Sequence, residues 1–225
     1  MARHILDNPA WASLTGPHAH FAEVRGGVRR YPVDVSVFVA LAGDPAPEDW
    51  PDLAAFAKPD GTVAVTGTDP VPPAGWELVQ TVPGVQLDGS AVYGAADPEA
   101  VRLGPADVPD MLDLVARTEP GPFLPRTVEM GTYLGFRHEG KLVAMAGERL
   151  HPPGWTEISA VCTDPSYRGQ GLATRLVLAV AAGIRARGET PFMHAAASNV
   201  NAIRLYESLG FTLRRHTTFS LLRVG

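Results

Sequence analysis

The sequence has a single cysteine, Cys162, no cluster of lysine or arginine, and no long run of apolar residues. One cysteine cannot form an internal disulfide or build a zinc cluster, so a disulfide-stabilised fold is excluded and a reducing, cytoplasmic location is expected. The formal net charge of −5 argues against nucleic-acid binding, because phosphate contacts need clustered cations. We therefore predict no nucleic-acid partner.

The apolar segments are too short to cross a membrane. The longest, residues 176–184, falls far below the roughly 20 residues that a spanning helix needs. The N-terminal sequence MARHILDNPAWASL has no uninterrupted apolar stretch after a basic start, so no signal peptide is predicted. Glycine and proline form about a fifth of the chain, below the roughly 25% typical of low-complexity sequence, so we expect a folded protein without a membrane partner.

The 225 residues allow one large domain or two small ones, and the two halves differ in charge. Residues 1–96 have 5 Lys and Arg against 11 Asp and Glu, whereas residues 97–225 have 14 against 13. Small and turn-forming residues at 94–98 mark the predicted boundary. We predict an N-terminal α/β domain over 1–96 and a second domain over 97–225, which tolerates an anionic ligand better.

The first half reads as alternating strands and helix. Strands are predicted over 35–41 and 62–68, with a helix over 47–57 between them. Residues 76–87 read as one or two short strands interrupted at Pro83–Gly84, because proline lacks a backbone donor. No reactive cluster stands out in this half.

The second half contains more elements in a denser order. The predicted strands are 101–103, 133–137, 141–149, 156–163, 191–195, 211–215 and 217–222, and the predicted helices are 106–117, 172–186 and 199–209. Successive side chains of a strand point to opposite faces, so the strand at 156–163 should have one polar face that lines a cleft. That face comprises Glu157, Ser159, Val161 and Thr163, and the opposite face comprises Ile158, Ala160 and Cys162.

A glycine-rich turn joins this strand to the next helix in the sequence AVCTDPSYRGQGLATRLV. The first N–H groups of a helix have no intrahelical partner, and together with the helix dipole they form a site for phosphate oxygens. Gly169 and Gly171 let the backbone approach a ligand without a Cβ in the way, and Arg168 adds a positive charge. The alternative interpretation is a turn that only reverses the chain.

Two other glycine-rich phosphate sites do not fit this turn. A Rossmann fingerprint needs a third glycine where this chain has Thr174. A P-loop needs Gly-Lys followed by Ser or Thr, which is absent.

Two motifs carry a family resemblance. Arg168-Gly169-Gln170-Gly171-Leu172-Ala173 resembles the Arg/Gln-x-x-Gly-x-Gly/Ala signature of the GCN5-related N-acetyltransferases (GNAT). Further along the chain, Asn199-x-x-Ala202-x-x-x-Tyr206-x-x-x-Gly210-Phe211 is similar to the motif that follows it in that family. The surrounding sequence is particularly similar to the FR47-like branch, and the resemblance spans about residues 101–223.

The resemblance implies an α/β (α+β) fold, with a mixed, mostly antiparallel sheet flanked by helices, and acetyl-CoA as acyl donor. In the family, the pyrophosphate of coenzyme A lies on the loop that corresponds here to Arg168, Gly169, Gln170, Gly171, Leu172, Ala173 and Thr174. The pantetheine arm would follow the preceding strand and bond the backbone of Val161 and Thr163, with Asn199 as a further partner.

The resemblance also implies catalytic residues. A tyrosine at the position of Tyr206 commonly protonates the leaving thiolate, although Tyr206 could instead be a core residue of an amphipathic helix. An ammonium has no lone pair, so a base is needed. Glu157 is the first candidate and Glu148, acting through water, the second; either could instead be an ion-paired strand residue. The N–H of Val161 is a candidate oxyanion donor.

No other nucleophile or metal site is predicted. Cys162 is expected to be a small buried hydrophobic residue. His18 and His20 have no cysteine or carboxylate at ligand spacing, and His194 lies in a predicted buried strand.

We therefore predict an acetyl-CoA-dependent N-acetyltransferase in which a primary amine attacks directly in a ternary complex. The acceptor, a small molecule or a peptide amine, is not encoded in any readable motif. The first half has no such glycine turn, so if it is a degenerate copy of the same fold it should not bind the cofactor. It could form a wall of the acceptor site, hold a homodimer together or only stabilise the second half. The alternative function is a non-catalytic acyl-CoA-binding or sensor module.

Overall fold

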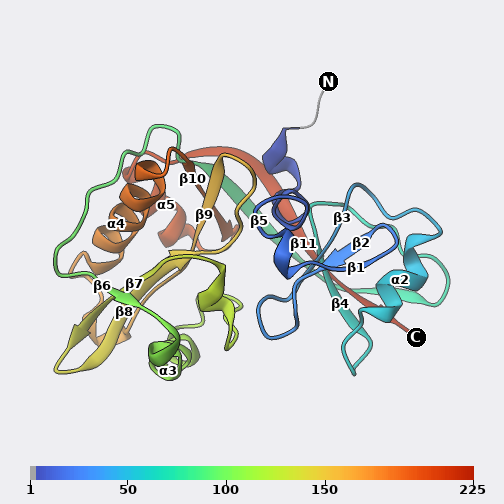
Figure 1. Ribbon diagram of the computed structural model, residues 1–225, viewed down its shortest axis with the longest axis horizontal. Helices are drawn as coiled ribbons and strands as arrows, with labels where there is room; N and C mark the ends of the chain where they lie inside the picture. The colour runs from blue at the N-terminus through green and yellow to red at the C-terminus, as the bar shows by residue number, and fades with distance from the viewer. Residues whose placement is uncertain (1–3) are drawn as a thin grey trace.

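The computed structural model describes residues 4–225, whose strands form one 11-stranded sheet. Figure 1 shows two lobes side by side, joined by two long strands, β5 (Trp76–Asp88) and β11 (Thr212–Val224). The strand order is β1-β2-β3-β4-β11-β5-β10-β9-β8-β7-β6. Two of the described strand pairs are parallel, β3 with β4 and β9 with β10, and the others are antiparallel. The predicted mixed, mostly antiparallel α/β fold is confirmed.

The N-terminal lobe is small and built around a short helix. Its elements are α1 (Pro9–Leu14), β1 (Glu23–Arg25), β2 (Val28–Arg30), β3 (Phe38–Leu41), α2 (Asp49–Ala55) and β4 (Thr62–Thr66). The predicted helix over 47–57 is shorter at both ends. At its start, the Asp49 carboxylate accepts the Ala46 N–H at 2.9 Å and closes a turn before the helix. Trp50 and Leu53 of α2 pack with the buried faces of β3 and β4.

The C-terminal lobe has helices on both faces of its sheet. Its elements are β6 (Val101–Leu103), α3 (Val108–Thr118), β7 (Tyr133–His138), β8 (Lys141–Glu148), β9 (Trp155–Thr163), α4 (Leu172–Ala186), β10 (Thr190–Ala196) and α5 (Val200–Ser208). One core cluster joins α4 and α5 to the sheet, and a second joins α3 to the opposite face (Figure 1). No helix within residues 4–225 is both long enough and apolar enough to span a bilayer.

The predicted interruption of the strand at Pro83–Gly84 is wrong, because β5 is a single strand of 13 residues. The carbonyl of Pro83 accepts the Ala197 N–H at 2.9 Å, so Pro83 faces the side where β10 has just ended. In an antiparallel strand the N–H and the carbonyl of one residue point to the same side. The absent N–H of Pro83 therefore lies on the side where β10 has ended, and no strand hydrogen bond is lost. The two strands predicted at the C-terminus are likewise one strand, β11, with a register shift between Leu213 and Arg215.

Strand β5 belongs to the sheet of both lobes. It pairs with β10 on one side and with β11 on the other, and its Val85 and Leu87 lie in the core cluster of α4. The division into domains 1–96 and 97–225 stays a prediction. The sheet itself runs across that boundary without a break.

Candidate functional site

The central feature of the site is the separation of two parallel strands. Strands β9 and β10 pair from Thr190 with Trp155 as far as Met193 with Ile158. Beyond this point β9 continues beside β8, whereas β10 continues beside β5. The backbone of residues 159–163 therefore faces a gap on its β10 side. The amide groups of an extended ligand can form hydrogen bonds with the backbone there.

A β-bulge in β9 lies at the start of this gap. Ser159 pairs with Gly147 and Cys162 with Met145, so Ala160 and Val161 together oppose one residue of β8. Ala160 has φ +53°, a left-handed conformation that is costly for a residue with a Cβ. A bulge leaves backbone groups out of the ladder, which makes them available to a ligand.

The bulge overturns the predicted alternation of faces. Val161 packs with Ile158 in the α4 cluster, whereas Ala160 and Cys162 lie in the α3 cluster. The prediction that Glu157 and Val161 share one face is therefore wrong. No glycine in the sequence TEISAVCT marks the bulge, so strict alternation was the expected pattern.

The glycine-rich turn has the geometry of an anion site. Gly169 and Gly171 have φ of +78° and +74°, and Gly171 is the N-cap of α4, a helix of 15 residues. Within residues 4–225 no group accepts a hydrogen bond from the N–H of residues 169 through 174. An ideal Cβ on either glycine would meet no atom within 4 Å, so the turn is open on the outside.

A further polar atom next to the turn lacks a partner. The hydroxyl of Thr163 is buried and makes no hydrogen bond to the part of the chain that the structure describes. Arg168 is exposed at the rim, and residues 168–174 include no carboxylate. This set of donors fits the pyrophosphate and arm of coenzyme A, since anions need N–H donors and cations.

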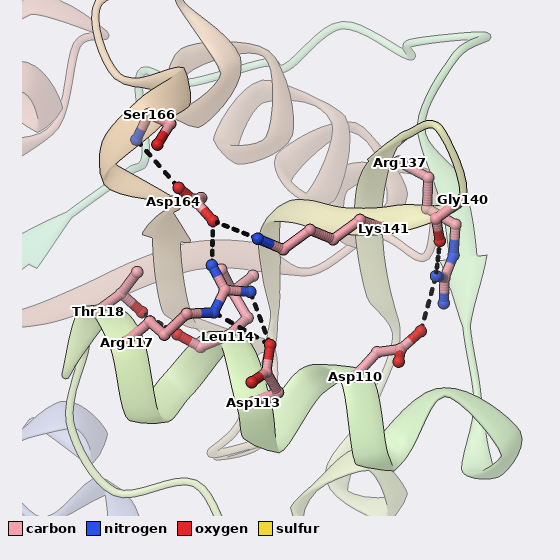
Figure 2. A network of polar contacts seen from close by, with 10 residues as sticks. All are labelled: Asp110, Asp113, Leu114, Arg117, Thr118, Arg137, Gly140, Lys141, Asp164 and Ser166. Atoms are coloured by element: carbon pink, nitrogen blue, oxygen red, sulfur yellow. Dashed lines mark hydrogen bonds and ion pairs between the residues drawn. The ribbon is translucent and has the colours of Figure 1, made fainter.

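Asp164 anchors the turn to the rest of the lobe (Figure 2). Its carboxylate contacts Arg117 of α3, lies 3.3 Å from the Lys141 ammonium and accepts the Ser166 N–H at 3.0 Å. The Ser166 N–H, followed by the two cations, holds the pKa of Asp164 below its usual range. Asp164 was not predicted as a site residue, although the Asp-Pro-Ser sequence is typical of a side-chain-capped turn.

Tyr206 lies on the α4 face of the gap. It is 6% exposed, belongs to the same core cluster as Val161 and Leu172, and packs edge-on against Phe211. Burial raises its pKa to about 12, so the phenol stays protonated at neutral pH. Its hydroxyl makes no hydrogen bond to residues 4–225.

Asn199 lies at the start of the helix that carries Tyr206. Its side-chain oxygen accepts the Ala202 N–H at 3.2 Å and caps α5. The amide NH₂ is not used by this cap, so it can still donate to a ligand. Its role in binding remains a prediction.

Glu157 does not line a cleft but is buried in an ion pair. It is 0% exposed, and Arg149 donates to both of its oxygens at 2.6 and 2.8 Å. Burial alone would raise the pKa of Glu157, but Arg149 and then His194 hold it well below its usual range. A carboxylate this acidic is a weak proton acceptor. Its role as base remains a prediction, and the ion pair weighs against it.

Glu148, the second candidate base, is also occupied. Its carboxylate lies 2.8 Å from the Arg187 guanidinium at the end of α4 and accepts the Thr132 N–H at 3.0 Å. It is 2% exposed. Its assignment as a base remains a prediction as well.

The hydrogen bonds around Gln86 fix the tautomer of His194. The amide nitrogen of Gln86 donates to the Leu6 carbonyl at 2.7 Å, and its oxygen accepts from Arg214 at 2.6 Å. The same nitrogen lies 3.0 Å from His194 Nε2, which must therefore accept, so that Nδ1 carries the hydrogen donated to Glu157 at 2.7 Å. The network runs from β9 through β10 and β5 to β11.

Cys162 is 7% exposed, and burial raises the pKa of its thiol to about 11. The reactive form of cysteine is the thiolate, so Cys162 is held in the unreactive form. The prediction that Cys162 is a buried residue is confirmed.

The chain is similar along its whole length to a crystal structure from Novosphingobium aromaticivorans that is assigned to the GNAT family of acetyltransferases. The two are 42% identical with a TM-score of 0.90, and the match covers 99% of this chain and 100% of the other. The sequence model of the family described as FR47-like protein matches residues 133–220. A GCN5-related N-acetyltransferase from Kribbella flavida, 19% identical, has the same fold with a TM-score of 0.62 and coverage of 99% and 96%.

Curated relatives match over a shorter region. The mycothiol acetyltransferase of Thermobispora bispora is 43% identical over 83 residues, which are 36% of this chain and 27% of that protein. The N-alpha-acetyltransferase RimI of Mycobacterium tuberculosis is 37% identical over 82 residues, which are 35% of this chain and 51% of that protein. The chain thus spans only about a quarter to a half of the curated relatives it matches.

Proposed function

Because the chain belongs to the GNAT family and is an acyltransferase, we propose that it transfers the acetyl group of acetyl-CoA to a primary amine by direct attack in a ternary complex. One observation supports this most strongly. The strand β9 loses its partner β10 after Ile158 and leads within a few residues into the open N–H groups at the start of α4.

We propose that these two features hold the donor. The N–H groups of residues 169–174 and Arg168 would bind the pyrophosphate, and the backbone of Val161 and Thr163 the arm, with Asn199 beside it. Acetyl-CoA supplies an acyl group that is already activated as a thioester.

The residues of the chain around the gap have separate roles in the proposal. Backbone N–H groups released by the bulge at Ala160–Val161 stabilise negative charge on the carbonyl oxygen. Tyr206 donates its phenol proton to the departing sulfur from the α4 face. The protonated state of Tyr206 at neutral pH suits it to this task.

The acceptor nitrogen must also lose a proton. Glu157 lies one residue before the end of the β9–β10 pairing, but both of its oxygens bond Arg149. We propose that Glu157 orients Arg149 and His194, and that the amine enters the site as the free base. After attack the nitrogen loses a proton, which returns to the Tyr206 phenolate formed when the phenol protonates the sulfur. Glu157 and Glu148 are the alternatives as direct proton acceptors.

The acceptor is proposed to be an amine of a small molecule or a peptide. Mycothiol acetyltransferase and the N-alpha-acetyltransferase RimI match the chain over similar shares of its length. Their names point to a small thiol compound and to a protein N-terminus, so the two matches do not favour one kind of acceptor over the other. The proline-rich segment 119–126, which leaves α3 on the face opposite Tyr206, would form one wall of the acceptor site.

The donor site is tested by thermal unfolding with and without acetyl-CoA. Ligand at about 100 times Kd stabilises by roughly 2.7 kcal/mol, which raises Tm by several degrees. Thr174→Asp changes the side-chain size little and favours the start of α4 through the dipole, yet it repels the pyrophosphate. We expect Thr174→Asp to be as stable as the wild type without ligand and to lose the shift.

The uncharged variant Thr174→Asn is the matched control and should keep most of the shift. No shift in the wild type, or an equal shift in Thr174→Asp, contradicts the proposed donor site. A normal shift without acetyl transfer to any amine would favour a binding or sensor module.

A further inference from the structure

The N-terminal lobe has an apolar hollow of about 440 Å³ that shares no residue with the proposed transfer site. Its volume lies within the range of protein ligand sites, roughly 300–1,000 Å³. Four prolines, two tryptophans and two alanines line it; the rings come from Pro45, Pro47, Trp50, Pro51, Pro73 and Trp76. These residues converge from the loop before α2, from α2 itself and from the start of β5.

The two tryptophans give the hollow a fixed aromatic floor. The ring centroids of Trp50 and Trp76 are 5.0 Å apart and their planes are inclined by 60°. Trp50 is only 8% exposed and packs in the core of the lobe, so its ring is held in place. A rigid aromatic surface of this kind binds apolar rings without a large loss of side-chain entropy.

The walls offer few backbone donors. Proline has no N–H, so the four prolines prevent a ligand from being added as a β-strand. A ligand of this hollow must instead be held by ring packing. A polyproline II segment has no internal hydrogen bonds, presents apolar ridges every third residue, and docks in aromatic-lined grooves.

The rim of the hollow is acidic. Residues 42–77 contain seven Asp and Glu residues and one lysine. Asp44, Glu48 and Glu77 each adjoin a lining residue in the sequence. The described ion pair among these three carboxylates is long, 3.6 Å from Arg223 to Glu77. The rim therefore favours a ligand with cations next to its apolar part.

We propose that this hollow docks a proline-rich segment of a partner protein that carries arginine or lysine beside its prolines. The prolines pack on Trp50 and Trp76, and the basic side chains face Glu48 and its neighbours. This inference goes beyond the proposed function and does not depend on it.

The test measures fluorescence anisotropy of a labelled peptide with two Pro-x-x-Pro repeats flanked by arginines. We expect saturable binding, and much weaker binding of two comparison peptides, one with alanine for proline and one with glutamate for arginine. Added salt should weaken binding of the basic peptide, because the rim charges are exposed. Absence of saturable binding, or equal binding of the three peptides, overturns the proposal.

Two variants of α2 locate the binding. Ala54 lines the hollow, whereas its neighbour Ala55 is exposed and does not. Ala54→Arg should reduce affinity at least about tenfold, as a clash at a packed contact does, and Ala55→Arg should leave it unchanged. Equal affinity in both variants overturns the proposal.

A charge variant keeps the test valid should Ala54→Arg be poorly folded. Glu48 is exposed, and Glu48→Lys should weaken binding of the basic peptide by about two- to fivefold. Circular dichroism should stay unchanged, and Tm should fall only slightly, because residue 48 is the N-cap of a short helix. Concentration-dependent dimerisation that Glu48→Lys abolishes would assign the hollow to a second copy of the chain and overturn the proposal.

Discussion

At the scale of single residues, Tyr206 and Glu157 are both buried but differ in their partners. The hydroxyl of Tyr206 makes no hydrogen bond to the described chain, whereas Glu157 bonds Arg149 and His194. A phenol that faces the gap without a protein partner is available to a ligand, whereas a fully paired carboxylate is explained by the fold itself. The two residues therefore respond differently to substitution.

Tyr206→Phe removes only the phenol oxygen. We expect kcat to fall by about 100-fold or more, as for the loss of a general acid, while the Kd of acetyl-CoA stays nearly the same. Steady-state kinetics together with a binding isotherm measure both. Unchanged turnover would remove Tyr206 from the acid role.

Glu157→Gln leaves the Arg149 charge buried without its counter-ion. We expect the free energy of unfolding to fall by about 3–5 kcal/mol, measured by denaturant titration. The double variant with Arg149→Met should recover part of this loss. The pH profile of kcat/KM should keep its shape in Glu157→Gln; loss of its acidic limb would make Glu157 the base after all.

Sequence reasoning located these two residues but not their surroundings. Tyr206 and Asn199 follow from motif spacing, since the motif lies within one helix and its cap. The contacts of Glu157 join β9 to β10 and to the residue that follows β8, and the partners Arg149 and His194 stand in no fixed spacing to it. Contacts of this kind depend on strand register, which the sequence alone does not specify.

At the scale of elements, the connection from β9 to α4 carries the proposed donor site. The strand, the turn and the helix were predicted nearly to the residue, because glycines and periodicity mark them. The bulge at Ala160 was not, since it is set by pairing with β8 and has no glycine. Asp164, which fastens the turn to α3 and β8, was also missed (Figure 2).

Asp164→Asn keeps an oxygen for the Ser166 N–H but loses its charge toward Arg117 and Lys141. We expect the KM of acetyl-CoA to rise by about three- to tenfold, as for a weakened charge-assisted hydrogen bond, with kcat almost unchanged. Asp113→Asn is the control, because Asp113 bonds Arg117 but does not touch the turn. An equal effect of both substitutions would contradict a positioning role for Asp164.

At the scale of the whole molecule, a buried histidine cluster lies where the N-terminal lobe meets the C-terminal one. His18 is 4% exposed, bonds the Tyr31 hydroxyl at 3.0 Å and stacks on His151 with ring centroids 4.8 Å apart. Burial, followed by the charge of His151, lowers the pKa of His18 to about 3. The folded protein therefore holds His18 neutral.

The depressed pKa of His18 makes stability depend on pH. In the unfolded chain the His18 imidazole is protonated below about pH 6.5, whereas in the folded chain it is protonated only below about pH 3. The free energy of unfolding therefore falls as the pH falls from 6.5 to 3. At pH 5 the loss is about 2 kcal/mol. Chemical denaturation at several pH values in this range measures the free energy of unfolding. It should fall less steeply with pH in His18→Gln than in the wild type, whereas His20→Gln, at an exposed neighbour, should follow the wild type. An unchanged fall in His18→Gln would contradict this assignment.

Homodimer formation and cytoplasmic location remain predictions at this scale. The fold class followed from motif and periodicity, but the path of the sheet through both lobes did not. Pairing of β5 with β10 and β11 is long-range, and local sequence patterns do not encode such partners.

The position of β5 also affects how the chain folds as it is made. Gln86 and its neighbour His194 are 108 residues apart, so β5 leaves the ribosome well before either strand that will flank it. Non-local strand pairing slows folding, and an unpaired strand edge invites aggregation during the delay. The two lobes can join into one sheet only after β11 has been synthesised, so folding should be slow and sensitive to deletion of β11.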